Sequence, residues 1–172
     1  MTPVDGPGEP PDVSQSVIDS VLDSGVVIEE IQVEKPPPLR SVAGGRHEAR
    51  ERAFHLLYET HIKTCSIQEV LEEQVLSPDP YTIKLLEAVD EHFEELTGII
   101  DRLAKGWSVE RMPSLDVALL RIGLCELAYC PEVPSGVVLS EAVALAGHYG
   151  TDDSSRFVNG LLSAATEELR PE

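Results

Sequence analysis

Residues 113–129 read PSLDVALLRIGLCELAY, and this stretch decides the fold. Its apolar residues point in every direction around a helix instead of lining one stripe. A helix that is apolar on all sides must be surrounded by other elements. The sequence therefore predicts a central helix here, enclosed by its neighbours.

Three charged residues interrupt this apolar stretch, namely Asp116, Arg121 and Glu126. They are five residues apart, so successive ones lie about 140° apart around a helix and share no stripe. Each of the three therefore needs its own route to solvent or its own partner.

On both sides of the central helix, apolar residues recur at intervals of three and four, and the alternation typical of strands is almost absent. Further helices are expected at about 46–62, 66–76, 80–93, 99–107, 136–148 and 154–169. Seven helices with short connections predict an all-α fold, a helical bundle in two layers.

Local signals place the helix starts and the buried faces. Ser66 with Glu69 has capping-box spacing, and Asp79 with Pro80 supplies an N-cap and a first-turn proline. Residues 151–154 offer several N-caps for the last helix. The buried faces are expected to include Ala49, Ala53, Phe54, Leu56 and Leu57 on the first helix, Ile67, Val70, Leu71 and Val75 on the second, and Ile83, Leu86, Val89 and Phe93 on the third.

Residues 1–45 differ in composition from the rest of the chain. They hold seven of the 13 prolines, with eight acids and two bases, and this composition predicts a disordered acidic tail. Residues 46–170 form the predicted domain. They stay acidic without the tail, and the whole chain has a net charge of −18, so any nucleic-acid site must be local.

Composition also limits the function classes. The chain lacks an apolar run long enough for a membrane span, a secretory signal pattern and a disulfide framework, which favours a cytoplasmic protein. Phosphate loops, nucleophile elbows and His-Glu-x-x-His helices are also missing, so we expect no enzyme activity and no cofactor. Cys125 and Cys130 could in principle ligate zinc, but no second Cys/His pair lies nearby, and core thiols are the preferred interpretation.

A cluster of arginines begins the first predicted helix, with Arg46 and Arg50 one turn apart and Arg52 close by. Cations at a helix amino terminus interact unfavourably with the helix macrodipole, so we expect another interaction to compensate for this placement. A nucleic-acid phosphate is one such interaction. Pairing with Glu48, Glu51 or acids of the tail is the other, and the residues alone favour it.

Four segments resemble the NusB family of transcription antitermination factors. They are RHEARERA with LLY at residues 46–58, WSVERMP leading into LLRI and EL at residues 107–127, VP through SEAVALA at residues 133–146, and GTDDSSRFVNGLL at residues 150–162. Together they cover about residues 46–170. The resemblance implies two packed helical subdomains.

The resemblance also implies function. Family members pair with NusE, a small-subunit ribosomal protein, and the pair binds the single-stranded boxA element of nascent ribosomal RNA, which helps RNA polymerase read through terminators. Carried over by position, the RNA-binding residues would be Arg46, His47, Arg50, Asp153, Arg156 and Phe157, and residues nearer the protein partner would be Tyr58 and Asp116. Arginine contacts to phosphate and aromatic stacking on bases are the usual chemistry of such binding. For Phe157, ordinary core packing is an equal alternative.

Departures from the family weaken the expected cationic patch. His47, Glu48, Gly136 and Gly147 stand where many members have basic residues, and Ser140 stands where they have asparagine. We therefore expect weak RNA binding by the isolated protein and a larger role for the partner. The tail is hypothesised to fold over the Arg46–Arg50 surface and compete with RNA.

Other functions remain open at this point. One is a protein-interaction module that keeps the NusE surface without RNA binding. Another is a domain associated with an RNA cytosine methyltransferase, which would have to act in trans because this chain shows no catalytic domain. Homodimerisation, which occurs in parts of the family, is not decided by the sequence.

Overall fold

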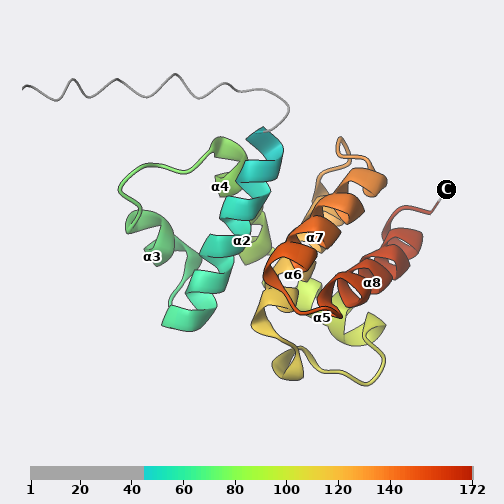
Figure 1. The fold of residues 1–172 in the computed structure, drawn as a ribbon. Coiled ribbons are helices and arrows are strands. Elements are labelled where there is room, and N and C mark those ends of the chain that lie inside the picture. Colours follow the sequence, from blue (N-terminus) through green and yellow to red (C-terminus); the bar gives the residue numbers. More distant parts are fainter. Residues whose placement is uncertain (1–44, 172) are drawn as a thin grey trace, which may run out of the picture. The chain divides into compact units, whose positions relative to one another are not determined.

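The computed structural model describes residues 45–171, and the expectations for the tail concern residues outside this range apart from Gly45. The described residues form seven α-helices and one short 3-10 helix (Figure 1). The helices are α2 (Gly45–Lys63), α3 (Ile67–Glu72), α4 (Pro80–Glu91), α5 (Phe93–Leu103), η1 (Val109–Arg111), α6 (Ser114–Tyr129), α7 (Ser135–Tyr149) and α8 (Ser154–Leu169). The predicted all-α fold is confirmed.

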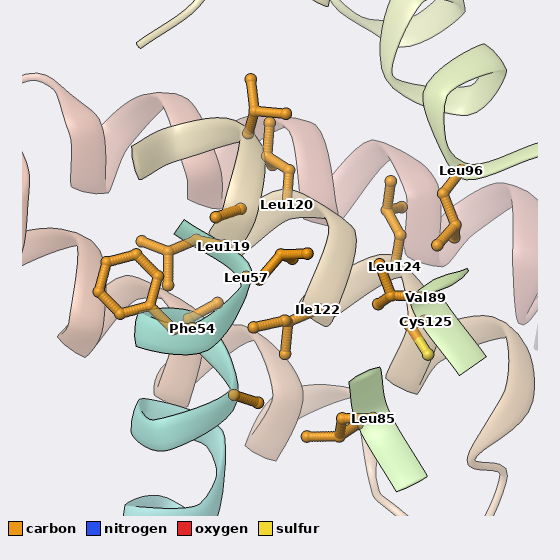
Figure 2. Close-up of a cluster of buried hydrophobic side chains, with 14 of the residues drawn as sticks. Phe54, Leu57, Leu85, Val89, Leu96, Leu119, Leu120, Ile122, Leu124 and Cys125 are labelled. Atoms are coloured by element: carbon orange, nitrogen blue, oxygen red, sulfur yellow. The ribbon is translucent and has the colours of Figure 1, made fainter. Parts of the chain in front are cut away.

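Helix α6 is the central element, as its sequence predicted. Every residue from Asp116 to Leu127 is buried except Arg121. The helix packs against α2 and α4 on one side and against α5, α7 and α8 on the other. Leucines and an isoleucine of α6 meet Phe54 of α2, Leu85 of α4 and Leu96 of α5 in one apolar core (Figure 2). The helices before and after residue 92 thus form two packed groups that share α6.

The helix starts predicted at Ser66 and Asp79 are confirmed by their capping contacts, whereas α5 begins at Phe93 instead of about residue 99, and Asp153 precedes α8 without a side-chain capping bond. The Ser66 hydroxyl accepts a hydrogen bond from the Glu69 backbone N–H at 3.2 Å, and the Glu69 carboxylate accepts one from the Ser66 backbone N–H at 2.7 Å. The Asp79 carboxylate accepts from the Tyr81 N–H at 2.7 Å, with Pro80 in the first turn. These contacts fix the start of α4 and hence the position of Tyr81.

Three apolar residues lie outside the positions that periodicity assigned to them. Helix α3 ends at Glu72, and Val75 is 99% exposed because the chain leaves the helix toward Pro78. Helix α4 ends at Glu91, so Phe93 begins α5 instead of closing α4. Trp107 follows a turn with positive φ at Lys105 and Gly106 and lies beyond α5, 57% exposed. Periodicity therefore predicted helices correctly at these places, but the predicted helices extend past the observed ends.

Arg170, just after α8, ties the end of the chain to the loop between α6 and α7. Its guanidinium donates hydrogen bonds to the carbonyl oxygens of Glu126 at 2.8 Å, Leu127 at 2.7 Å, Cys130 at 2.9 Å and Val133 at 2.6 Å. The carbonyls of Glu126, Leu127 and Cys130 lie at the carboxyl end of α6, where several carbonyl oxygens lack an intrahelical donor, and that of Val133 lies in the loop that follows. The contact holds that end of α6 in place and with it the side chain of Glu126.

Candidate nucleic-acid interface

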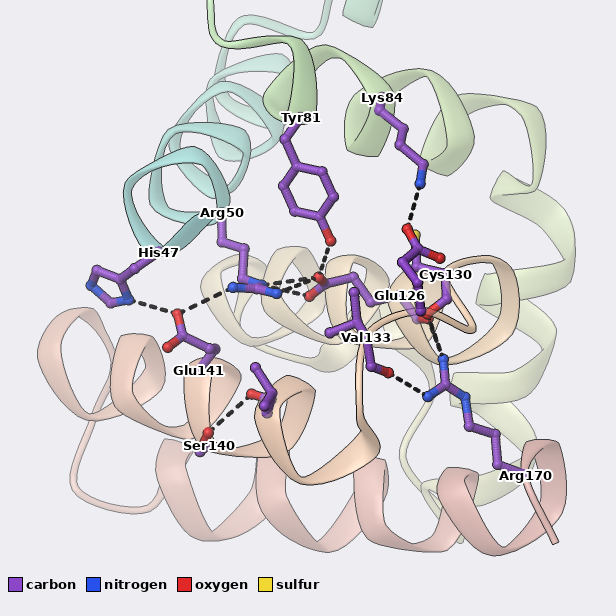
Figure 3. A network of polar contacts seen from close by, with 12 residues as sticks. His47, Arg50, Tyr81, Lys84, Glu126, Cys130, Val133, Ser140, Glu141 and Arg170 are labelled. Carbon is purple, nitrogen blue, oxygen red and sulfur yellow. Dashed lines mark hydrogen bonds and ion pairs between the residues drawn. The ribbon is translucent and has the colours of Figure 1, made fainter. Parts of the chain in front are cut away.

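The side chain of Arg50 is buried and paired with Glu126, the last of the three charges on α6. Arg50 is only 3% exposed, and its Nε and Nη2 atoms donate to the Glu126 carboxylate at 2.8–3.0 Å (Figure 3). Burial alone would lower the pKa of Arg50, but the hydrogen bond to Glu126 raises it above its ordinary value. The guanidinium is therefore charged, and its N–H groups already donate to the Glu126 carboxylate.

Further polar groups complete this network. The Tyr81 hydroxyl donates to Glu126, and burial together with this bond raises the pKa of Tyr81. Glu141 of α7 lies 3.5 Å from Arg50 and 2.7 Å from His47 Nδ1. Figure 3 shows Glu141 between these two side chains. Arg50 thus pairs with carboxylates of α6 and α7. The alternative drawn from the sequence is therefore right that Arg50 pairs with carboxylates but wrong in naming Glu48 and Glu51, and the acids of the tail, its third candidate, lie outside the described residues.

Arg46, one turn before Arg50, is exposed at the start of α2. Its guanidinium carbon lies 5.1 Å from the centre of the Tyr81 ring, which is a cation–π contact. The Lys84 ammonium lies 5.8 Å from the same ring and also pairs with Glu132 at 2.9 Å. Lys84 was not predicted from the sequence, although its place on the first turns of the helix that begins at Pro80 indicates it. Arg46 and Lys84 are the accessible cations at this end.

The other predicted residues gather at the start of α8. Arg156 is almost fully exposed and, among the described residues, pairs only with Asp153 at 3.6 Å. Phe157 is half-buried, packs against the core, and lies 6.5 Å from Trp107 between ring centres. One side of Phe157 packs inward, as the core-packing alternative predicted, and the other lines a pocket, while its stacking on RNA bases stays a prediction.

The structure does not bring these two sets of residues into one cluster. Arg50 pairs with Glu126 near the carboxyl end of α6, whereas Phe157 shares a pocket with Asp116 near its amino end. Ten residues of α-helix separate Asp116 from Glu126, which corresponds to about 15 Å. A ligand that contacts both places must be extended.

The remaining charges of α6 have no carboxylate or cation partner among residues 45–171. Arg121 stacks on Phe93 at 4.0 Å and donates to the Thr97 hydroxyl at 3.2 Å, and burial lowers its pKa. Asp116 is 4% exposed, and burial raises its pKa although a hydrogen bond from Ser154 opposes the shift. Tyr58, the other residue assigned to a protein partner, is half-buried on α2.

Cys125 and Cys130 are free thiols buried in the core, and burial raises the pKa of Cys125 to about 12. Within residues 45–171, no three His, Cys, Asp or Glu side chains are grouped as a metal site would require. In the same range, no helix is both long and apolar enough to cross a membrane.

Residues 45–171 thus form an all-helical bundle with exposed cations at the start of α2 and an aromatic pocket at the start of α8. Residues 47–167 match the model of the NusB family, and the chain belongs to this family.

Curated relatives agree with this assignment. The transcription antitermination protein NusB of Thermobifida fusca is 40% identical over 129 residues, which are 73% of this chain and 91% of the relative. The protein of the same name from an Arthrobacter species is 41% identical over 130 residues, which are 73% and 95% of the two chains.

Solved structures agree as well. T. maritima NusB aligns with a TM-score of 0.67 at 26% identity, over 73% of this chain and 93% of that one. A chain from a crystal structure of the antitermination factors NusB and NusE in complex with double-stranded RNA aligns with a TM-score of 0.64 at 28% identity, over 74% and 99%.

Proposed function

We propose that this chain is a cytoplasmic antitermination factor that binds boxA-type RNA of nascent ribosomal RNA transcripts together with NusE and promotes read-through by RNA polymerase. Its membership of the NusB family and its similarity to a chain crystallised with NusE and RNA support the proposal. The observation that carries it is that Arg46 at the start of α2 and Arg156 at the start of α8 are both exposed to solvent, although the chain as a whole is strongly acidic.

In this proposal the helical unit of residues 46–170 acts as one RNA- and protein-binding domain. Arg46 contacts phosphate at the start of α2, with His47 beside it. Arg156 contacts phosphate near Phe157, which stacks on an unpaired base, and Asp153 lies next to them. Arg50 acts indirectly, because its bond to Glu126 holds the start of α2 against α6. Tyr58 lies on the side proposed for the protein partner.

The proposed site predicts weak RNA binding by the protein alone. Two well-exposed arginines supply few phosphate contacts, and each contact contributes to affinity and to its salt dependence. His47 already contacts the Glu141 carboxylate at 2.7 Å, and this carboxylate competes with phosphate for the imidazole. NusE must therefore provide a substantial part of the binding surface.

The test is filter binding of a single-stranded boxA-type RNA, measured with the full chain alone, with NusE alone and with both. We expect binding by both proteins together at a concentration at least tenfold lower than by either alone, which corresponds to about 1.4 kcal/mol of coupling. Equal RNA binding by NusE with and without this chain, despite a stable complex of the two proteins, would instead support the protein-interaction module.

A further inference from the structure

Two adjoining cavities beside α2, α5 and α6 share one cation, Arg121, which the proposed function does not use. Their volumes are about 280 Å³ and 390 Å³, near the lower end of the roughly 300–1,000 Å³ typical of small-ligand sites. The residues that line both cavities are Leu57, His61, Phe93 and Arg121. A small molecule in either cavity therefore lies against Arg121.

Arg121 has more hydrogen-bonding capacity than the fold uses. A guanidinium carries five N–H donors, and within residues 45–171 the only hydrogen bond from this one runs from Nη2 to the Thr97 hydroxyl at 3.2 Å. Its Nε atom is shielded from solvent and has no partner among these residues. Its Nη1 atom has no partner among them either but is not fully shielded, so this end of the guanidinium can reach a ligand.

The charge of Arg121 is not balanced by a nearby carboxylate. Within residues 45–171 the guanidinium contacts Phe93 and Thr97 but no carboxylate, and burial lowers its pKa, although the more distant Glu94 opposes this shift. A partly buried cation without a counter-ion keeps a desolvation cost that a bound anion would offset. A carboxylate also matches the planar fork of a guanidinium. An anion is therefore the class of ligand that Arg121 favours.

Acidic residues around the cavities limit the charge of that anion. Asp90 lines the larger cavity and Glu110 the smaller one, and Glu94 is close enough to act on the pKa of Arg121. Each of these carboxylates repels every negative charge that a ligand brings. A phosphate dianion or an RNA strand is therefore disfavoured relative to a ligand with a single negative charge.

The other walls are largely apolar. The Phe93 ring lies 4.0 Å from the guanidinium carbon, and Leu57 and Val117 add aliphatic surface. We propose that these cavities bind a small monocarboxylate with a compact apolar body, its carboxylate on Arg121 and its body against Phe93 and Leu57. The proposal goes beyond the proposed function, because this binding involves neither RNA nor NusE.

The test is a titration of the isotope-labelled full chain at neutral pH, followed by nuclear magnetic resonance, with benzoate, benzamide and inorganic phosphate in separate arms. Benzoate is expected to shift the Arg121 Nε–H signal with a Kd on the order of 1 mM, which is reasonable for a ligand of this size. Benzamide has the same shape without the charge, and phosphate has more charge without the apolar body. We expect each of them to bind at least tenfold more weakly than benzoate.

The substitution Arg121→Met removes the charge and keeps an unbranched side chain of similar length. It should weaken benzoate binding at least tenfold, read from the neighbouring backbone signals, and leave benzamide binding unchanged. The matched control Arg102→Met removes the same charge from an exposed position on α5 that pairs with Glu168, and it should bind benzoate like the wild type. Phe93→Ala, at a position that is 39% exposed, should weaken benzoate binding severalfold.

Each possible result bears on the proposal. Equal binding of benzoate and benzamide, measured on the wild type alone, would overturn it even if Arg121→Met failed to fold. Phosphate binding as tight as that of benzoate, or an equal loss in Arg102→Met, would also overturn it. Arg121 signals that respond to NusE but to none of the small molecules would make this place a protein contact instead. A failure of RNA binding in the filter assay would leave this site untouched, since its titration uses the chain alone.

Discussion

Replacing Arg50 by alanine is expected to lower the free energy of unfolding by about 3–5 kcal/mol, because it leaves the Glu126 carboxylate buried without its cation. Glu126 is 1% exposed and holds three hydrogen bonds from Arg50 in addition to the one from Tyr81. The measurement is urea denaturation of the full chain followed by far-ultraviolet circular dichroism.

Two comparisons make this result specific. Arg46→Ala removes the same charge from an exposed position one turn away and should change the stability by no more than about 0.5 kcal/mol. The double variant Arg50→Met with Glu126→Leu removes both buried charges and should regain most of the loss. A single Arg50→Ala variant as stable as Arg46→Ala would show that the pair does not support the fold.

Replacing Phe157 by alanine is expected to weaken RNA binding by about 1–3 kcal/mol, a loss of roughly fivefold to 150-fold in affinity, because a stacking surface for one base disappears. Filter binding of single-stranded boxA-type RNA by the NusE-bound chain measures the effect. Phe93→Ala is the matched control, since Phe93 is also partly exposed but lies at the start of α5 against Arg121.

The two variants also separate base stacking from core packing. Phe157 touches the core, so its replacement should lower the unfolding free energy somewhat as well. If RNA affinity stayed unchanged while stability fell, Phe157 would be a core residue only. If Phe93→Ala weakened RNA binding equally, the loss would not be specific to the start of α8.

The fold was largely predictable because local rules determine it. The apolar stretch at residues 113–129 predicted a surrounded helix, and α6 is buried from Asp116 to Leu127 apart from Arg121. The Ser66 capping box and the Asp79-Pro80 start depend on residues one to three positions apart, which a sequence displays directly. Helix ends were less predictable, since Val75 and Trp107 follow the periodicity but lie past the last hydrogen-bonded turn.

The site was only partly predictable because its decisive contacts are distant in sequence. Spacing along α6 showed that Glu126 needed a partner, but nothing local indicates that the partner is Arg50, 76 residues earlier. The same pairing changes the interpretation of the arginine cluster, where Arg46 and Arg52 are exposed but Arg50 is buried. The pocket around Asp116 joins three separate segments, and no spacing rule predicts such a meeting.

The central claim is that a few exposed arginines at two separate places hold RNA on an acidic protein. It is tested most directly by the slope of log affinity against log salt concentration, measured on single-stranded boxA-type RNA with the NusE-bound chain. We predict that Arg46→Ala and Arg156→Ala each reduce the slope by about 0.7, that the double variant reduces it by about 1.4, and that Arg102→Ala leaves it unchanged. Arg102 pairs with Glu168 on another part of the surface and is also exposed. A wild-type slope in the double variant, or an equal reduction in Arg102→Ala, would contradict the claim.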